Sequence, residues 1–101
     1  MLKTNIEEKD GRVVVTPVGE LETSVCDSFQ EEMAQLTRRE GLNMELDLGS
    51  LEYISSKGLR VLISMQKAIS DNGGRMVVTE VTEAVREVFD MTGLTRSFLV
   101  E

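Results

Sequence analysis

Short runs of β-branched and other apolar residues alternate with longer segments of helical periodicity along this chain. The extended runs cover Arg12 to Val18, Asn43 to Leu48 and Arg75 to Thr79. A parallel crossover between two strands needs a dozen or more residues, and each intervening segment is long enough to supply a helix. We therefore predict parallel pairing, with right-handed crossovers that place the helices on one face of the sheet.

The two ends of the chain add strands to this pattern. A first extended run, Thr4 to Lys9, is joined to the run at Arg12 by Asp10-Gly11. Asp-Gly between two extended runs is the strongest short signal for a hairpin. A short fifth strand is expected at Phe98 to Val100. The sequence thus predicts an α/β fold with a mixed, mostly parallel sheet of four to five strands and three main helices packed on one face.

Three helices are predicted between the strands. The first begins at Ser24, whose hydroxyl is expected to cap it together with Asp27. The second runs from about Lys57 to Asp71, and the third covers about Thr82 to Asp90. The apolar side of these helices is expected to form the core, and it consists of Phe29, Met33, Leu36, Leu59, Leu62, Ile63, Ile69, Val85, Val88 and Phe89.

Length and composition limit the possible functions. With 101 residues and 41% hydrophobic residues, the chain fits one domain, residues 1–101, with a single core. A net charge of −7 argues against affinity for nucleic acid or for an anionic membrane surface. No stretch approaches the roughly 18 apolar residues of a membrane span, and the N-terminus lacks the apolar core of a signal peptide. We expect a cytoplasmic protein that binds a protein partner or a small ligand, without nucleic acid and without direct membrane insertion.

The counts of cysteine and histidine restrict the chemistry further. Cys26 is the only cysteine and there is no histidine, so an intramolecular disulfide, a Cys/His zinc cluster and histidine-dependent catalysis are excluded. The sequence also lacks a G-x-S-x-G nucleophile elbow and a P-loop. We therefore expect no enzyme, no metal and no cofactor, with Cys26 as a small core residue.

The segment that leaves the third extended run and enters the second helix is the candidate functional site. In open α/β sheets, functional groups collect where carboxyl ends of strands meet helix N-termini. Ser55 and Ser56 stand at the expected N-cap, where serine contributes about 1 kcal/mol over alanine. A phosphate would also be tolerated there, beside unpaired N–H groups and the positive end of the helix dipole. Nearby, Tyr53 is expected to be a packing anchor, and Asp47 is either a solvent-face residue or a polar support for the junction.

Three motifs occur in a fixed order along the chain. They are Gly19-Glu20-Leu21-Glu22, then Tyr53-Ile54-Ser55-Ser56-Lys57-Gly58-Leu59, then Phe89-Asp90-Met91-Thr92-Gly93-Leu94. In this order and at these intervals they resemble the STAS-domain anti-sigma factor antagonists of bacteria. The resemblance covers essentially the whole chain and implies a single STAS-like domain.

The resemblance implies a partner-switching function. The unphosphorylated form of such a protein binds an anti-sigma factor, which is typically also a serine kinase, and thereby frees a sigma factor. A serine phosphatase acts on the phosphorylated form. In the family pattern Asp-Ser-Ser-Gly-Leu, the serine after the Asp is the phosphoacceptor, and it corresponds to Ser56, with Ser55 as the backup. The chain departs from the pattern because Ser55 replaces the Asp and Lys57 replaces the second serine. An alternative remains open, namely a STAS subunit without phosphorylation, for example of a transporter ATPase complex.

The expected partner-binding surface combines the turn after the second strand, the serine junction and the first half of the second helix. On that helix, Val61 and Met65 are interpreted either as a docking patch or as core residues, and Gly58 is expected to leave room for a partner's backbone. The complete set of expected contact residues is Gly19, Glu20, Glu22, Ser55, Ser56, Lys57, Gly58, Arg60, Val61 and Met65.

Overall fold

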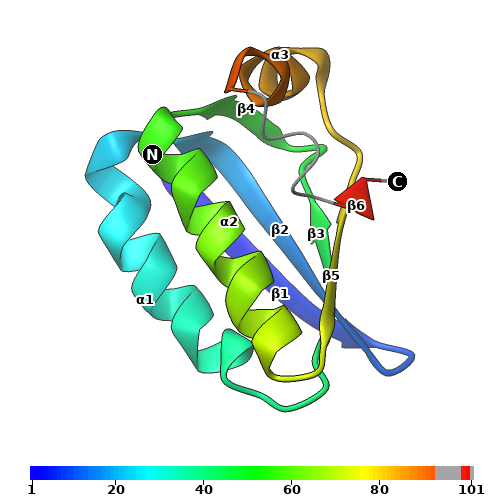
Figure 1. Cartoon of the computed structure of the whole chain (residues 1–101). Helices are drawn as coiled ribbons and strands as arrows, with labels where there is room; N and C mark the ends of the chain where they lie inside the picture. The colour runs from blue at the N-terminus through cyan, green and yellow to red at the C-terminus, as the bar shows by residue number, and fades with distance from the viewer. Residues whose placement is uncertain (93–98, 101) are drawn as a thin grey trace.

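Two long helices lie side by side across one face of a mixed β-sheet (Figure 1). The computed structural model describes residues 1–92 and 99–100 of the chain. Its elements in chain order are β1 (Leu2–Lys9), β2 (Arg12–Leu21), the short 3-10 helix η1 (Thr23–Val25), α1 (Cys26–Thr37), β3 (Asn43–Asp47), β4 (Leu51–Ile54), α2 (Ser56–Asp71), β5 (Arg75–Thr79), α3 (Glu83–Thr92) and β6 (Leu99–Val100).

The sheet has the order β1-β2-β3-β5-β6, with β4 paired to β2 outside this path. Only β1 and β2 pair antiparallel, and every other pair in the described sheet is parallel. The predicted α/β class with a mixed, mostly parallel sheet is therefore confirmed. The described sheet has six strands because the third extended run is followed directly by a separate strand, β4.

A two-residue turn joins β1 to β2. Asp10 and Gly11 have positive φ angles of 54° and 76°, and Lys9 pairs directly with Arg12. Positive φ at both central residues is the geometry that makes Asp-Gly a favoured hairpin sequence. The predicted hairpin is confirmed.

A tight turn separates β3 from β4. The Asp47 Oδ1 atom accepts a hydrogen bond from the Gly49 backbone nitrogen at 2.9 Å, and Leu51 N donates to Leu48 O at 3.1 Å. The chain then continues beside the far end of β2, where Gly19 pairs with Leu51. Asp47 is thus the polar support of the turn, one of the two roles that its sequence position left open.

An irregularity in the β2–β4 register explains why β4 was not predicted. Gly19 pairs with Leu51, but the next residue, Glu20, pairs with Tyr53. Leu51 and Ile54 are both buried, with two exposed residues between them. An extra residue in a strand allows this burial pattern, which breaks the alternation by which strands are detected in sequence.

The core lies between the sheet and the two helices α1 and α2. Val15 and Leu46 on the strands and Met33 and Leu62 on the helices are all fully buried. In β5, Met76, Val77 and Val78 are buried in succession, with Met76 and Val78 in the core cluster and Val77 outside it. Close packing of these side chains fixes where α2 begins relative to the sheet.

The observed start of α1 differs from the predicted one. Ser24 lies inside η1, and α1 follows with no side-chain hydrogen bond at its N-cap residue, Val25. The predicted Ser24 cap is therefore wrong, because the chain enters α1 through a 3-10 turn. Helix α3 begins after Thr82, whose Oγ1 accepts a hydrogen bond from Val85 N at 3.4 Å, and packs against β4 (Figure 1).

Part of the expected C-terminal region lies outside the described residues. This applies to Gly93 and Leu94 of the third motif and to Phe98 at the start of the expected fifth strand. The strand β6 itself pairs with β5 in parallel. In the described part of the chain, no helix has the length and apolar character needed to cross a bilayer.

Candidate functional site

Ser55 is the N-cap residue of α2. Its backbone is extended, with φ −83° and ψ 166°, and its Oγ accepts a hydrogen bond from the Gly58 backbone nitrogen at 3.0 Å. Its own backbone nitrogen donates to Leu21 O at the end of β2, at 3.0 Å. The side chain is 7% exposed. The helix therefore starts at a position that is fixed by a side-chain cap and by a backbone bond to the sheet.

Cys26 joins three segments beneath the cap. Its thiol donates a hydrogen bond to Glu22 O at 3.2 Å, and Cys26 Sγ lies 3.8 Å from Ser55 Oγ. Cys26 is fully buried, so its prediction as a small core residue is confirmed. Through these contacts the end of β2, the start of α1 and the start of α2 hold one another in place.

Ser56 is the first residue of α2 and is exposed to solvent. Backbone N–H groups in the first turn of a helix have no intrahelical acceptor, and the cap satisfies only that of Gly58. The N–H groups of Ser56 and Lys57 therefore remain beside the Ser56 hydroxyl. The two serines differ sharply, because the Ser55 hydroxyl is buried and bonded while that of Ser56 is accessible. Ser55, predicted as the backup phosphoacceptor, is therefore the less accessible of the two hydroxyls.

Two cationic side chains flank Ser56. Lys57 Nζ lies 3.0 Å from Asp27 Oδ1 on α1, with exposed side-chain fractions of 45% and 84%. Arg60, one turn further along α2, is exposed. An ion pair this exposed contributes little to stability, about 0–1 kcal/mol, so both cations remain available to a new negative charge at Ser56.

Three residues expected to bind the partner lie in the core instead. Val61 is 4% exposed and Met65 is 3% exposed. Gly58 is buried, and a Cβ atom placed on it would lie 2.8 Å from Leu21 Cγ and 2.9 Å from Leu21 O. The docking patch on α2 is therefore wrong, and core packing is the correct interpretation of Val61 and Met65. Gly58 lets α2 approach β2, not a partner.

The first motif forms the end of strand β2, not a turn after it. Gly19 has a φ of 109°, and a side chain there would overlap the carbonyl oxygen of Met1 on β1's side of the sheet. Gly19 is therefore required by the fold. Glu20 is exposed, and the Glu22 carboxylate accepts a hydrogen bond from the Met1 amino group at 3.1 Å. Of this motif, the two glutamates remain as possible partner contacts.

Tyr53 is on the surface, contrary to its expected role as a packing anchor. Its exposed fraction is 48%, and it pairs in register with Glu20 on β2. Sequence reasoning missed it because an aromatic before a helix is usually a buried contact. Two consecutive non-aliphatic residues, Glu52-Tyr53, between Leu51 and Ile54 are the signal that would have revealed an outward-facing pair.

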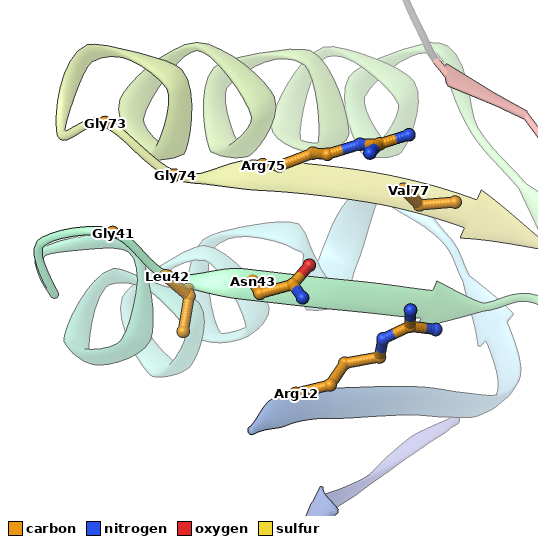
Figure 2. A pocket seen from close by; sticks show the side chains of 8 residues that line it. All are labelled: Arg12, Gly41, Leu42, Asn43, Gly73, Gly74, Arg75 and Val77. Atoms are coloured by element: carbon orange, nitrogen blue, oxygen red, sulfur yellow. The ribbon is translucent and has the colours of Figure 1, made fainter. Parts of the chain in front are cut away.

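A separate hollow of about 340 Å³ lies at the other end of the parallel strands. Figure 2 shows the side chains of Arg12, Asn43 and Arg75 along its wall. Asn43 and Arg75 are the first residues of β3 and β5, whereas the chain reaches Ser56 only beyond the carboxyl end of β3. This hollow is therefore not part of the site at α2.

On the sheet face away from α1 and α2, the Glu45 carboxylate accepts hydrogen bonds from two neighbouring strands. Its Oε1 accepts a hydrogen bond from Arg12 Nη1 at 2.8 Å, and its Oε2 accepts one from Thr79 Oγ1 at 3.0 Å. These two bonds, the Arg12 bond foremost, hold the pKa of Glu45 below its ordinary value, against the opposing effect of burial. The network ties β2, β3 and β5 together on the side away from α1 and α2.

Comparison with known proteins agrees with the motifs. The STAS domain family matches residues 3–101. An anti-sigma F factor antagonist from Paenibacillus polymyxa is 32% identical over 94 residues, which is 92% of this chain and 80% of that protein. The crystal structure of an anti-sigma factor antagonist from Mycobacterium paratuberculosis superposes with a TM-score of 0.87 at 23% identity, covering 99% of this chain and 85% of that one.

A further solved structure has the same fold in a modified state. The Bacillus cell fate determinant SpoIIAA in its phosphorylated form superposes with a TM-score of 0.73 at 16% identity, covering 98% of this chain and 91% of that one. The resemblance indicated by the three sequence motifs is confirmed, and this chain belongs to the STAS domain family.

Proposed function

We propose that this chain is a cytoplasmic anti-sigma factor antagonist that acts by partner switching. Its unphosphorylated form binds an anti-sigma factor with serine kinase activity and thereby releases a sigma factor. Phosphorylation of Ser56 abolishes this binding, and a serine phosphatase restores it. The observation that carries the proposal is the exposed Ser56 side chain at the first position of α2, beside a cap that already occupies Ser55.

In this proposal the chain is a phosphoryl acceptor and not an enzyme. The Ser56 oxygen attacks the γ-phosphorus of the kinase's ATP, the bond from that phosphorus to the ADP oxygen breaks, and the hydroxyl proton passes to a base of the kinase. Such a step requires an accessible acceptor oxygen. Ser56 meets this requirement, whereas Ser55 is 7% exposed and accepts the Gly58 bond.

The fold is expected to tolerate the phosphate. A phosphoserine carries about −1.5 to −2 charges at neutral pH, and helix N-termini stabilise negative charge through free N–H groups and the helix dipole. Lys57 and Arg60 add positive charge within one turn. The phosphorylated SpoIIAA structure supports this expectation, because that protein keeps the fold in its modified form.

Because the phosphorylated protein should stay folded, the loss of binding must arise at the surface that contacts the partner. Docking a partner over Ser56 removes water from the phosphate and from its cations, and it adds bulk where the hydroxyl fitted. A tenfold loss of affinity requires only about 1.4 kcal/mol, which is less than truncation of one buried interfacial charge pair commonly costs.

The departures from the family pattern fit this function. Ser55 occupies the place of the family's Asp and makes the side-chain cap to Gly58. Serine and aspartate are both preferred N-cap residues, so the substitution preserves the start of the helix. Lys57, in place of the second serine, points to Asp27 and leaves Ser56 as the accessible serine at this junction.

Titration calorimetry with the purified anti-sigma factor tests the proposal. Ser56→Ala should bind with the affinity of the unphosphorylated wild type, and Ser56→Asp should stay folded but bind at least about tenfold more weakly. Ser64→Asp is the matched control, because Ser64 is also exposed on α2 and receives the same charge. Equal affinity of Ser56→Asp and wild type would refute the switch and favour a STAS subunit with constitutive binding, such as one in a transporter ATPase complex.

A further inference from the structure

Strand β4 exposes a tyrosine next to a glutamate, and a second glutamate pairs with the tyrosine from β2. Glu52 and Tyr53 are both exposed, while Leu51 and Ile54 on either side of them are buried. Because both exposed residues lie at the register irregularity, their side chains leave the same strand away from the core. Glu20 pairs with Tyr53 on the neighbouring strand and is also exposed.

A hollow adjoins Glu52, without contribution from Tyr53 or Glu20. It has a volume of about 520 Å³, lies between β2, β4 and the start of α3, and is lined in part by Val18, Glu52 and Ala84. Val18 and Ala84 give it apolar walls, and Glu52 gives it an acidic rim. We call Glu20, Glu52 and Tyr53 the Tyr53 surface, which borders this hollow through Glu52.

Among the described residues, the two carboxylates of the Tyr53 surface have no ion-pair partner. Neither Glu20 nor Glu52 forms an ion pair with any described Lys or Arg, whereas Glu8, Glu22, Glu45 and Asp27 all have a cationic partner. An aromatic face beside free carboxylates is complementary to a guanidinium group, which stacks on the ring and bonds a carboxylate through two N–H groups.

We propose that the Tyr53 surface is the anchor for an arginine-bearing face of the anti-sigma factor, with Tyr53 as the central contact. This inference rests on the proposed function and assigns that partner's chemistry. Exposed tyrosines that become buried are enriched among the residues that dominate binding energy. With Val61 and Met65 in the core, the large apolar residues left exposed in the described chain are Met1, Ile6, Tyr53 and Met91, and of these Tyr53 is the nearest to Ser56 in the sequence.

Tyr53 and Ser56 are close enough for one partner to cover both. Three residue steps separate their Cα atoms, which even a fully extended chain spans in at most about 11 Å. A standard interface buries about 800 Å² on each partner, an area about 30 Å across. The switch at Ser56 and the anchor at Tyr53 thus fit within a single contact area.

The chain's only tyrosine makes the test direct. It has one tyrosine and no tryptophan, so 3-fluorotyrosine gives a single ¹⁹F resonance that reports on Tyr53. On saturation with unlabelled anti-sigma factor, this resonance should shift and lose its difference between H₂O and D₂O. Tyr53→Ala should weaken binding at least about tenfold, and Tyr53→Phe less than about threefold, because the ring face makes the contact.

Matched variants separate a local contact from a general effect. Ile6 on β1 is 45% exposed, close to the 48% of Tyr53, so Ile6→Ala should leave the affinity within about twofold. Glu20→Lys and Glu52→Lys should each slow association and weaken binding about tenfold, whereas Glu31→Lys, on the exposed side of α1, should not.

The outcomes distinguish this inference from the proposed function. If the anti-sigma factor binds wild type and Ser56→Asp weakens that binding, but the ¹⁹F resonance stays solvent-exposed and Tyr53→Ala binds normally, the Tyr53 anchor is refuted and the switch stands. If wild type does not bind an anti-sigma factor at all, the proposed function fails and the anchor fails with it.

Discussion

The Ser55 hydroxyl oxygen lies 3.0 Å from the Gly58 backbone nitrogen, and this one bond gives two adjacent serines different roles. It turns the Ser55 side chain inward, where Cys26 and the end of β2 enclose it. It also fixes Ser56 as the first residue of α2, with its side chain in solvent. A structural serine and an accessible serine thus follow each other in the sequence.

Removing the Ser55 cap should destabilise the protein while leaving the Ser56 side chain unchanged. Ser55→Ala leaves the Gly58 N–H without its acceptor, and we expect the free energy of unfolding to fall by about 0.5–2 kcal/mol. Urea unfolding followed by circular dichroism measures this change. Ser55→Asp restores an N-cap acceptor and should recover most of the loss. A Ser55→Ala variant as stable as wild type would contradict the assigned cap.

Gly58 should resist even the smallest side chain. The methyl group of Gly58→Ala would meet Leu21 Cγ at 2.8 Å and Leu21 O at 2.9 Å, so α2 must shift away from β2. We expect a loss of about 1–3 kcal/mol from overpacking, reduced by the roughly 1 kcal/mol that alanine gains in helix propensity. Ser64→Ala provides the comparison, because it raises propensity at an exposed site of the same helix and should not destabilise.

Met65 should behave as a core residue. It is 3% exposed, so Met65→Ala should lower the free energy of unfolding by about 2–5 kcal/mol. Thermal and urea unfolding both measure the effect. An unchanged stability together with a loss of partner binding would instead restore Met65 to the docking surface.

Glu45 predicts a specific dependence of stability on pH. Bonds from Arg12 and Thr79 lower its pKa in the folded state, so its contribution is present above the unfolded pKa and is lost as the pH falls through the folded pKa. Glu45→Gln should therefore be less stable than wild type near pH 7 and approach it in acid. The difference should stay below about 1 kcal/mol, because the Arg12 side chain is 45% exposed. Urea midpoints for both proteins between pH 7 and pH 2 measure it, with the exposed-site variant Glu31→Gln as a control.

Local patterns in the sequence predicted most of the fold. The Asp10-Gly11 hairpin, the alternation of strands and helices, and the start of α2 all depend on neighbours in the chain. Strand β4 was not predicted, because it forms only through its pairing with β2 and its burial pattern is irregular. Long-range pairing of this kind leaves no periodic signal.

The sequence predicted the location of the candidate site, but not which of the surrounding side chains are buried and which are exposed. The paired serines at a helix start were found from spacing and motif. Which residues of α2 turn inward depends on the approach of α2 to Leu21, and this contact buries Gly58 together with Val61 and Met65. The exposure of Tyr53 follows from the β4 register for the same reason. Tertiary contacts thus determine whether Gly58, Val61, Met65 and Tyr53 are buried or exposed, which is why the sequence alone did not predict it.

Phosphopeptide mapping tests the central claim most directly. Wild type and Ser56→Ala would be incubated with the purified anti-sigma factor and ATP, and each chain would then be digested and analysed by mass spectrometry. We predict one phosphate on Ser56 in wild type and none in Ser56→Ala, although Ser55 is retained, and the phosphorylated chain should no longer bind the anti-sigma factor. A phosphate on Ser55, or a phosphorylated chain that binds as tightly as before, would contradict the account.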